Sequence, residues 1–334
     1  MRRFLTVFVV FACAAVALSP SSASAAKEPF DAWVAELAKD AKKRGIGQKG
    51  LSALEGVAPI PKVIELDRKQ PEGTMTFERY LQIVVKEERI KEGRRLRAEH
   101  AELLEKVAAQ HGVDPEFIVA LWGVETSFGT ITGDYPVVAS LATLAHDGRR
   151  AKMFRAQLLD ALRIIDQGHV SASEMKGSWA GAMGQCQFMP GTFLAYAFDQ
   201  DGDGRKDIWG TLPDVFGSAA NYLKKIGWKR GTGWGVEVVL PKGFDEKLVG
   251  RNTRKSADEW AKLGVKAKDG GALKAPAPAS IVRPGGKTDR VFMIWGNYRV
   301  LLNWNRSEYF ATGVSLLAEE IAKGDAGEAP SPAP

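Results

Sequence analysis

The sequence predicts a mainly α-helical protein with a small β-rich insertion. Up to about residue 230, apolar residues recur at the spacing of amphipathic helices. Beyond Gly231 the pattern changes, because residues 236–240 alternate and are β-branched, which predicts a strand, and residues 241–290 are rich in Gly, Pro, Lys and Ala. The 334 residues suffice for one large domain or two modest ones with a sizeable core.

Residues 1–25 have the pattern of a secretory signal peptide. Arg2 and Arg3 precede an apolar run over residues 4–18, and small residues at 23–25 form a cleavage pattern. The apolar run is short for a membrane span. Residues 10–12 before Cys13 make a poor lipidation motif, so we expect a cleaved, unlipidated, exported chain with no membrane span.

Helical patterns follow in order along the chain. The segment 30–43 is amphipathic, with Trp33, Leu37 and Ala41 on one face. Further helices are predicted within residues 78–111, 115–125, 137–145, 151–167 and 216–226, and strands at 236–240, 265–267 and 280–283. These elements group into an N-terminal helical region (26–95), a core (96–230), the β-rich insertion (231–290), a return to the core (291–324) and a tail that is disordered by composition (325–334).

Composition and charge argue against several function classes. Without residues 1–25 the chain has 44 basic and 40 acidic side chains, a mildly basic balance. The basic residues form no aromatic-interleaved patch, so we expect no nucleic-acid partner. Cys186 is then the one cysteine left, which rules out an internal disulfide, and without a neighbouring histidine it is not expected to act as a nucleophile. The four histidines show no metal-ligand spacing.

Glu125 is the strongest catalytic candidate. It ends a short apolar helix in which Phe117 and Leu121 share its face, and Asp114 and Pro115 supply a start signal, with Asp114 as the capping residue. That face should point inward, and a carboxyl group without water favours its neutral form near neutral pH. Glycosidic cleavage needs such an acid to protonate the leaving oxygen. The alternative is a glutamate at a helix end that faces solvent.

A glycine-rich segment, residues 177–193, is a candidate binding loop. Small residues allow the backbone to approach a ligand closely. The segment also combines neutral hydrogen-bonding groups with apolar walls, as sugar sites do: Ser178, Gln185, Gln187, Trp179, Met183 and Phe188. The alternative is a structural loop without a ligand.

An acidic stretch, residues 199–207, matches the start of a calcium loop. Oxygen ligands stand at the first, third and fifth positions, glycine at the sixth and a backbone carbonyl at the seventh: Asp199, Asp201, Asp203, Gly204 and Arg205. The usual glutamate at the twelfth position is replaced by Gly210. Asp214 is positioned to close a longer loop, and a solvated acidic turn is the alternative.

Three motifs, in this order, resemble the membrane-bound lytic transglycosylase B family of bacterial peptidoglycan-cleaving enzymes. They are residues 122–129 (WGVETSFG), residues 180–190 (AGAMGQCQFMP) and the acidic loop. Residues 70–72 (QPE) with 76–77 (TF), and residues 304–310 (WNRSEYF), are also similar. The resemblance spans nearly all of the chain after residue 25 and implies a lysozyme-like α+β core.

The resemblance implies cleavage of the β-1,4 bond between N-acetylmuramic acid and N-acetylglucosamine, with the muramic 6-hydroxyl closing a 1,6-anhydro ring. By position, Glu125 is the sole acid and base, Ser178 and Gln187 line the glycan site, and Asn305 and Tyr309 lie near it. The implied calcium ligands are Asp199, Asp201, Asp203, the Arg205 carbonyl and Asp214.

Two other functions remain open from the sequence. A muramidase that uses water and retains configuration needs a second carboxylate about 5 Å from the first, for which Asp134, Asp147 and Glu174 are candidates. The other alternative is a peptidoglycan-binding scaffold without turnover.

We expect no cofactor in the chemistry and calcium only in a structural role. The expected partners are peptidoglycan glycan strands and other cell-wall enzymes, and the expected state is a monomer. The signal pattern together with the resemblance predicts the periplasm of a Gram-negative bacterium.

Overall fold

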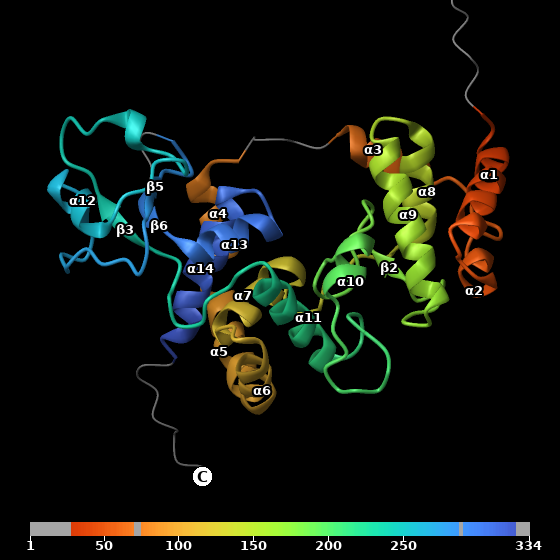
Figure 1. Ribbon diagram of the computed structural model, residues 1–334, viewed down its shortest axis with the longest axis horizontal. Coiled ribbons are helices and arrows are strands. Elements are labelled where there is room, and N and C mark those ends of the chain that lie inside the picture. The colour runs from red at the N-terminus through yellow and green to blue at the C-terminus, as the bar shows by residue number, and fades with distance from the viewer. Residues whose placement is uncertain (1–27, 70–74, 287–289, 325–334) are drawn as a thin grey trace, which may run out of the picture.

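The computed structural model describes residues 28–69, 75–286 and 290–324, and they are mainly α-helical with two small antiparallel sheets (Figure 1). A mainly α fold with a small β-rich part is the class that the sequence predicts. The predicted signal peptide (1–25) and the predicted disordered tail (325–334) lie outside the described residues.

Three helices begin the described chain: α1 (Phe30–Lys43), α2 (Gln48–Ser52) and α3 (Pro61–Arg68). α1 has the predicted bounds and buries Leu37 and Ala41. The carboxylate of Asp166 accepts hydrogen bonds from the N–H groups of Gly47 (2.9 Å) and Gly50 (3.1 Å). These amides at the start of α2 have no partner within the helix, so Asp166 satisfies them and fixes α2 in place.

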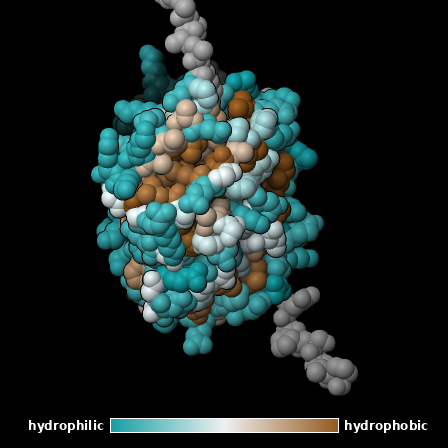
Figure 2. Space-filling model, turned by 90° about the vertical axis from the view of Figure 1, so that its right-hand side faces the viewer, coloured by the Kyte–Doolittle hydropathy of each residue, from teal (hydrophilic) through white to brown (hydrophobic). Residues whose placement is uncertain are grey.

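Two longer helices, α8 (Val137–Asp147) and α9 (Ala151–Asp166), pack against each other and against α2 and α3 at one end of the molecule (Figure 1). Asp67 on α3 is buried and pairs with Arg149 and Arg150 in the connection between α8 and α9. Figure 2 views this end: its surface is mostly hydrophilic, with the largest hydrophobic area in its upper part and smaller ones elsewhere.

The predicted helical stretch 78–111 consists of three helices: α4 (Phe77–Val84), α5 (Glu87–Glu99) and α6 (Ala101–His111). Arg89 explains the first break, because its Nη1 donates to the carbonyls of Ile83 (2.7 Å) and Val84 (2.9 Å) and so satisfies the end of α4. α6 ends at Gly112, whose φ of 68° is a left-handed conformation that glycine adopts without strain. Periodicity alone does not reveal such breaks, since all three helices are amphipathic.

The centre of the molecule is formed by five further helices: α7 (Pro115–Thr126), α10 (Pro190–Tyr196), α11 (Leu212–Lys225), α13 (Gly296–Trp304) and α14 (Glu308–Ala322). α14 packs against α4, α5, α7 and α13. A two-stranded sheet of β1 (Tyr135–Pro136) and β2 (Lys176–Gly177) joins the segment after α7 to the glycine-rich segment. Large side chains such as Phe77, Phe216 and Tyr298 are fully buried in this main core.

A four-stranded antiparallel sheet lies at the opposite end from α1 (Figure 1). Its order is β4-β3-β6-β5, from the strands β3 (Gly235–Val239), β4 (Lys266–Ala267), β5 (Ser280–Val282) and β6 (Val291–Ile294). The three predicted strands are present. β6 extends the sheet past residue 290, the predicted end of the insertion. Its four residues are all apolar, and such a short run does not distinguish a strand from a helix.

The strand β6 also separates two hydrophobic clusters. Phe292 and Ile294 belong to the main core, whereas Met293 belongs to a smaller cluster around Trp260 on α12 (Ala257–Lys262). Successive side chains of a strand point to opposite faces, which places one cluster on each side. The β-rich part is therefore a small unit with its own apolar centre. It is attached to the helical core through β6 and β5, since Val282 of β5 also belongs to the main core while its neighbour Ile281 belongs to the smaller cluster.

Among the described residues, no helix is long and apolar enough to cross a membrane.

Candidate active site

Helix α7 positions Glu125 in its last turn. Phe117 and Leu121 on the same face are buried. Pro115 occupies the first turn, as the sequence predicts. The prediction that Asp114 caps the helix was wrong, because its carboxylate accepts instead from Trp228 Nε1 and the Gly231 amide, each at 2.9 Å. Asp114 thus ties the start of α7 to the chain that leaves α11.

The carboxyl group of Glu125 lies in a small pocket, although the residue as a whole is only half-buried. The other residues of the pocket are mostly apolar: Ile118, Leu121, Trp122, Gln185, Cys186, Val215, Phe216, Ala219 and Trp304. Burial raises the pKa of Glu125 to about 7, and the hydrogen bond from Trp304 acts against this rise. The group therefore holds a proton at mildly acidic pH and can release it near neutrality.

Trp304 is the direct partner of Glu125. Its Nε1 donates to Glu125 Oε1 at 2.7 Å. The indole ring itself packs against Phe188 (5.3 Å between ring centroids) and Tyr222 (4.9 Å). The sequence shows Trp304 only as the first residue of a family-like segment, and nothing in its spacing reveals a contact with a residue 179 positions away.

Tyr80 is a second residue that sequence reasoning missed. Burial, and then the charge of Glu125, raise the pKa of Tyr80 to about 12, so the phenol stays neutral. Its ring lies 5.7 Å from that of Tyr309, on the α4 side of the site. The family-like residues 76–77 stand at the start of this helix, α4, but they gave no signal for position 80.

Gln185 connects the glycine-rich segment to the end of α7. The side-chain Oε1 of Gln185 accepts a hydrogen bond from Trp122 Nε1 at 2.8 Å, and the backbone carbonyl of Gln185 accepts one from the hydroxyl of Thr126 at 3.1 Å. Gly184 has a φ of 61°, and a Cβ there would meet the Ile208 carbonyl oxygen at 2.5 Å. Glycine is therefore required at this position for both conformation and space.

Two of the predicted glycan-binding residues, Gln187 and Phe188, are linked to Glu125 through Trp304, which lines pockets with both. They share with Trp304 a shallow surface pocket that also includes Met189, Thr192 and Tyr222. Gln187 has a left-handed φ of 49°, and its Nε2 donates to the carbonyls of Thr132 and Gly184, each at 3.0 Å. A non-glycine residue held in this conformation by its own side chain indicates a fixed loop.

The other predicted site residues have different surroundings. Met183 is fully buried, so the prediction that it forms a wall of the open site was wrong; it belongs to the main hydrophobic core instead. Ser178 Oγ accepts from the Ala182 amide at 3.0 Å within the loop. Asn305 is exposed and its Oδ1 accepts from the Ser307 amide, while the Tyr309 ring packs against Phe77 at 5.1 Å.

No second carboxylate lines the Glu125 pocket among the described residues. Glu174 is exposed and bonded to Ser171, and Asp147 pairs with Arg68. Asp134 is exposed. The other ionisable group in the pocket is Cys186, whose thiol pKa is raised by burial and by the charge of Glu125, so it is not a reactive thiolate.

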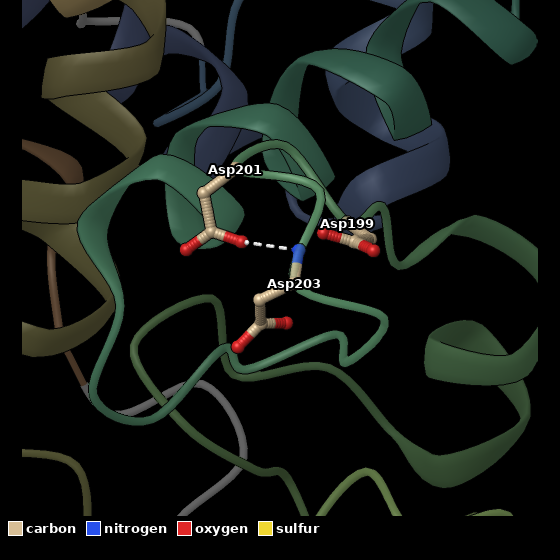
Figure 3. Close-up of side chains that lie close together, drawn as sticks. All are labelled: Asp199, Asp201 and Asp203. Atoms are coloured by element: carbon tan, nitrogen blue, oxygen red, sulfur yellow. Dashed lines mark hydrogen bonds between the residues drawn. The ribbon is translucent and has the colours of Figure 1, made fainter.

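The acidic loop brings three carboxylates together, as Figure 3 shows for Asp199, Asp201 and Asp203. Oxygen atoms of the three lie within 4.8 Å of one another. Each also accepts from loop amides: Asp199 from Gly202 and Gly204, Asp201 from Asp203, and Asp203 from Arg205. Oxygen ligands at this separation suit a hard divalent cation.

Asp214 does not join this cluster. It is buried in the first turn of α11, and its two oxygens accept from the amides of Gln200 and Asp207, each at 2.7 Å. Asp214 as a calcium ligand therefore stays a prediction; in this structure its carboxylate holds the loop backbone at these two amides. The side chain of Arg205, whose carbonyl was the other predicted ligand, reaches the His169 carbonyl at 3.3 Å.

The sequence and structure of this chain are similar to those of known proteins. The family described as "Transglycosylase SLT domain" matches residues 29–319. The chain belongs to the transglycosylase SLT domain family.

Three relatives of this SLT-domain chain illustrate the match. Membrane-bound lytic murein transglycosylase B of Escherichia coli (strain K12) is 32% identical over 233 residues, which cover 67% of this chain and 61% of that protein. The crystal structure of SltB3 from Pseudomonas aeruginosa in complex with NAG-NAM-pentapeptide has 42% identity and a TM-score of 0.86, covering 89% of this chain and 80% of that one. The structure of the Escherichia coli lytic transglycosylase Slt35 in complex with calcium has 28% identity and a TM-score of 0.72, covering 87% and 92%.

These matches confirm the lysozyme-like fold that the resemblance implied for this SLT-domain chain. The chain spans 61% of the length of the Escherichia coli transglycosylase B.

Proposed function

We propose that this chain is a peptidoglycan lytic transglycosylase that cleaves the β-1,4 bond between N-acetylmuramic acid and N-acetylglucosamine and forms 1,6-anhydro-N-acetylmuramic acid. The observation that carries the proposal is a single carboxyl group, Glu125, in an otherwise mostly apolar pocket with the Trp304 N–H as its hydrogen-bond donor. Burial there raises the pKa of Glu125 to about 7. Membership of the transglycosylase SLT domain family supports it.

One carboxyl group serves both steps. Neutral Glu125 protonates the glycosidic oxygen as the bond to the muramic C1 breaks, and an oxocarbenium-like centre develops. Glu125, now a carboxylate, takes the proton of the muramic 6-hydroxyl while that oxygen bonds to C1. The proton given in the first step is thereby recovered, and no water enters the product. The Trp304 indole N–H stabilises the carboxylate between the two steps.

The proposed substrate groove runs past the Glu125 pocket. Gln187, Phe188 and Trp304 form its floor beside Glu125, since they share one surface pocket. Ser178, Asn305 and Tyr309 are assigned to it on the family resemblance alone.

The decisive experiment is mass spectrometry of products from purified sacculi. We expect muropeptides lighter by one water than those that lysozyme releases, and none from Glu125→Gln, which keeps glycan binding. Full-mass products would support the hydrolytic muramidase instead. No release by the wild-type protein would support a binding scaffold.

We propose a structural calcium ion at Asp199, Asp201 and Asp203. The three carboxylates form the start of a calcium loop, and the related Slt35 has been crystallised with calcium. The ion would offset the repulsion among three close carboxylates and takes no part in the reaction.

We propose a periplasmic location in a Gram-negative bacterium, after cleavage of a signal peptide at residues 1–25. The substrate is then the cell wall itself, with other cell-wall enzymes as further partners and the chain acting as a monomer. The division near residues 95 and 230 is likewise proposed as the domain organisation, with the end of the β-rich insertion moved from residue 290 to the end of β6 at residue 294.

A further inference from the structure

A broad, open pocket rich in arginine lies between the loop after residue 249 and the junction of α13 and α14. Its charged lining residues are Arg251, Arg254, Arg299, Arg306 and Glu308. Four guanidinium groups face one carboxylate, so the pocket carries a strong local positive charge. Neither the core packing nor the chemistry at Glu125 uses this charge.

Part of the pocket is fixed in place. Arg299 is half-buried, and its Nη2 donates to the Arg251 carbonyl (2.9 Å) and to Ser280 Oγ (2.6 Å). Arg251 pairs with Glu308 at 3.1 Å. Arg254 and Arg306 are exposed, and within the described chain neither has an ion-pair partner. The pocket therefore combines one half-buried guanidinium that is fixed by hydrogen bonds, that of Arg299, with two exposed ones that have no ion-pair partner within the described chain, those of Arg254 and Arg306.

The arginines also repel one another. Burial, and then the charges of Arg254 and Arg251, lower the pKa of Arg299. An anion in the pocket relieves this repulsion, and the planar fork of each guanidinium matches the two oxygens of a carboxylate.

The pocket adjoins the proposed groove. Asn303 and Arg306 line it, and between them lies Trp304, whose indole contacts Glu125. Two residues of chain span at most about 7 Å, so the backbone of Arg306 lies within that distance of the backbone of Trp304. Tyr222, which lines the Gln187 pocket, also donates to the Asn303 carbonyl at 2.9 Å.

We propose that this arginine pocket binds free carboxylates of the peptide stem carried by the glycan substrate. The inference rests on the proposed function and adds a peptide-recognising site to it. A stem is attached to the muramic residue whose glycosidic bond is cut, so it must pass close to Glu125. The ligand named for the related SltB3 structure also carries a pentapeptide.

The test measures binding in Glu125→Gln, which removes turnover. Titration calorimetry compares a defined glycan tetramer that carries peptide stems with the same tetramer after amidase removal of the stems. We expect the peptide-bearing glycan to bind about tenfold more tightly, since hydrogen bonds between charged groups are strong. The difference should shrink at high salt, because exposed charges are screened.

A triple variant tests the pocket directly. When Arg254→Gln and Arg306→Gln are added to Glu125→Gln, the two glycans should bind with equal affinity, and the affinity for the peptide-free glycan should not change. Both side chains are exposed, so the variant should melt like its parent. Lys42→Gln with Lys43→Gln is the matched control: both side chains are exposed on α1, neither has an ion-pair partner within the described chain, and their removal takes away the same charge.

Equal affinity for the two glycans in Glu125→Gln would overturn the inference, as would an equal loss in the control variant. A competition with inorganic polyphosphate gives one more outcome against the inference. If polyphosphate binds but does not compete with the peptide-bearing glycan, the pocket is assigned to phosphate polymers and the inference is overturned. Failure of the proposed function has another signature: neither glycan binds, and the wild-type protein releases no muropeptide.

Discussion

At Glu125, the chemistry depends on one carboxyl group and one indole nitrogen. The apolar pocket raises the pKa of the carboxyl to about 7, and the Trp304 N–H limits that rise by stabilising the ionised form. These two influences act in opposite directions. Together they keep the group able both to give and to take a proton within the physiological range.

Trp304→Phe should therefore shift the pH profile upward. The variant keeps the ring packing against Phe188 and Tyr222 but loses the donor to the carboxylate. A hydrogen bond to a charged group contributes about 1.5–3 kcal/mol, so the alkaline limb of activity should move up by about one pH unit or more. The maximal rate should fall, since the second step uses the carboxylate.

The measurement is muropeptide release across pH 5–9, with saturating sacculi. Phe188→Leu, which perturbs the same packing without touching the donor, serves as the control and should leave the limb in place. If the alkaline limb of the pH–activity profile does not move in Trp304→Phe, the indole N–H does not stabilise the Glu125 carboxylate as proposed.

At the scale of elements, α7 is held at both ends. Gln185 of the glycine-rich segment fixes its C-terminal end, and Asp114 ties its start to Trp228 and Gly231. The helix thus presents Glu125 from a rigid position, which matters for proton transfer over hydrogen-bond distances.

The variant Asp114→Ser distinguishes two roles of Asp114: capping the start of α7, and connecting that start to Trp228 and Gly231. Serine caps helices about as well as aspartate, but its short side chain does not reach both Trp228 Nε1 and the Gly231 amide. We expect a loss of about 1–3 kcal/mol in the free energy of unfolding, measured by urea denaturation. Asp31→Ser, in the exposed first turn of α1, is the control and should cost much less. If both variants unfold alike, Asp114 has no special part in the stability of this region.

Local sequence patterns predicted much of the fold, because the type of a helix or strand depends largely on residues that are close together in the sequence. The bounds of α1, the three predicted strands and the position of Glu125 all follow from spacing that the chain itself carries. The breaks within residues 78–111 depend on a capping side chain, Arg89, and β6 is too short and too apolar for its type to be read. The Trp304 contact and the role of Asp214 arise only when distant segments meet.

At the scale of the whole molecule, a main helical core and a small β-rich unit share two strands, β5 and β6. The acidic loop lies between α10 and α11, and Asp214 of α11 supports it from below. Its three close carboxylates therefore couple any bound cation to the stability of the central helices.

Calcium should accordingly raise the melting temperature of the full chain. Binding to the folded state alone at about 100 times the dissociation constant adds about 2.7 kcal/mol. Thermal melts in EDTA and in millimolar calcium measure the effect, and Asp199→Asn with Asp201→Asn should remove it. Magnesium is the control ion and should do less, since it demands a stricter octahedral geometry. Identical melts in calcium and EDTA would contradict the proposed ion.

The central claim is that Glu125 is a neutral acid near neutral pH, and direct titration tests it best. Carboxyl ¹³C chemical shifts of labelled protein, recorded from pH 3 to 9 and assigned by comparison with Glu125→Gln, report its ionisation. The pocket predicts a midpoint at about 7. A midpoint near the ordinary value of 4.5 would show a solvated, ionised carboxylate and contradict the account.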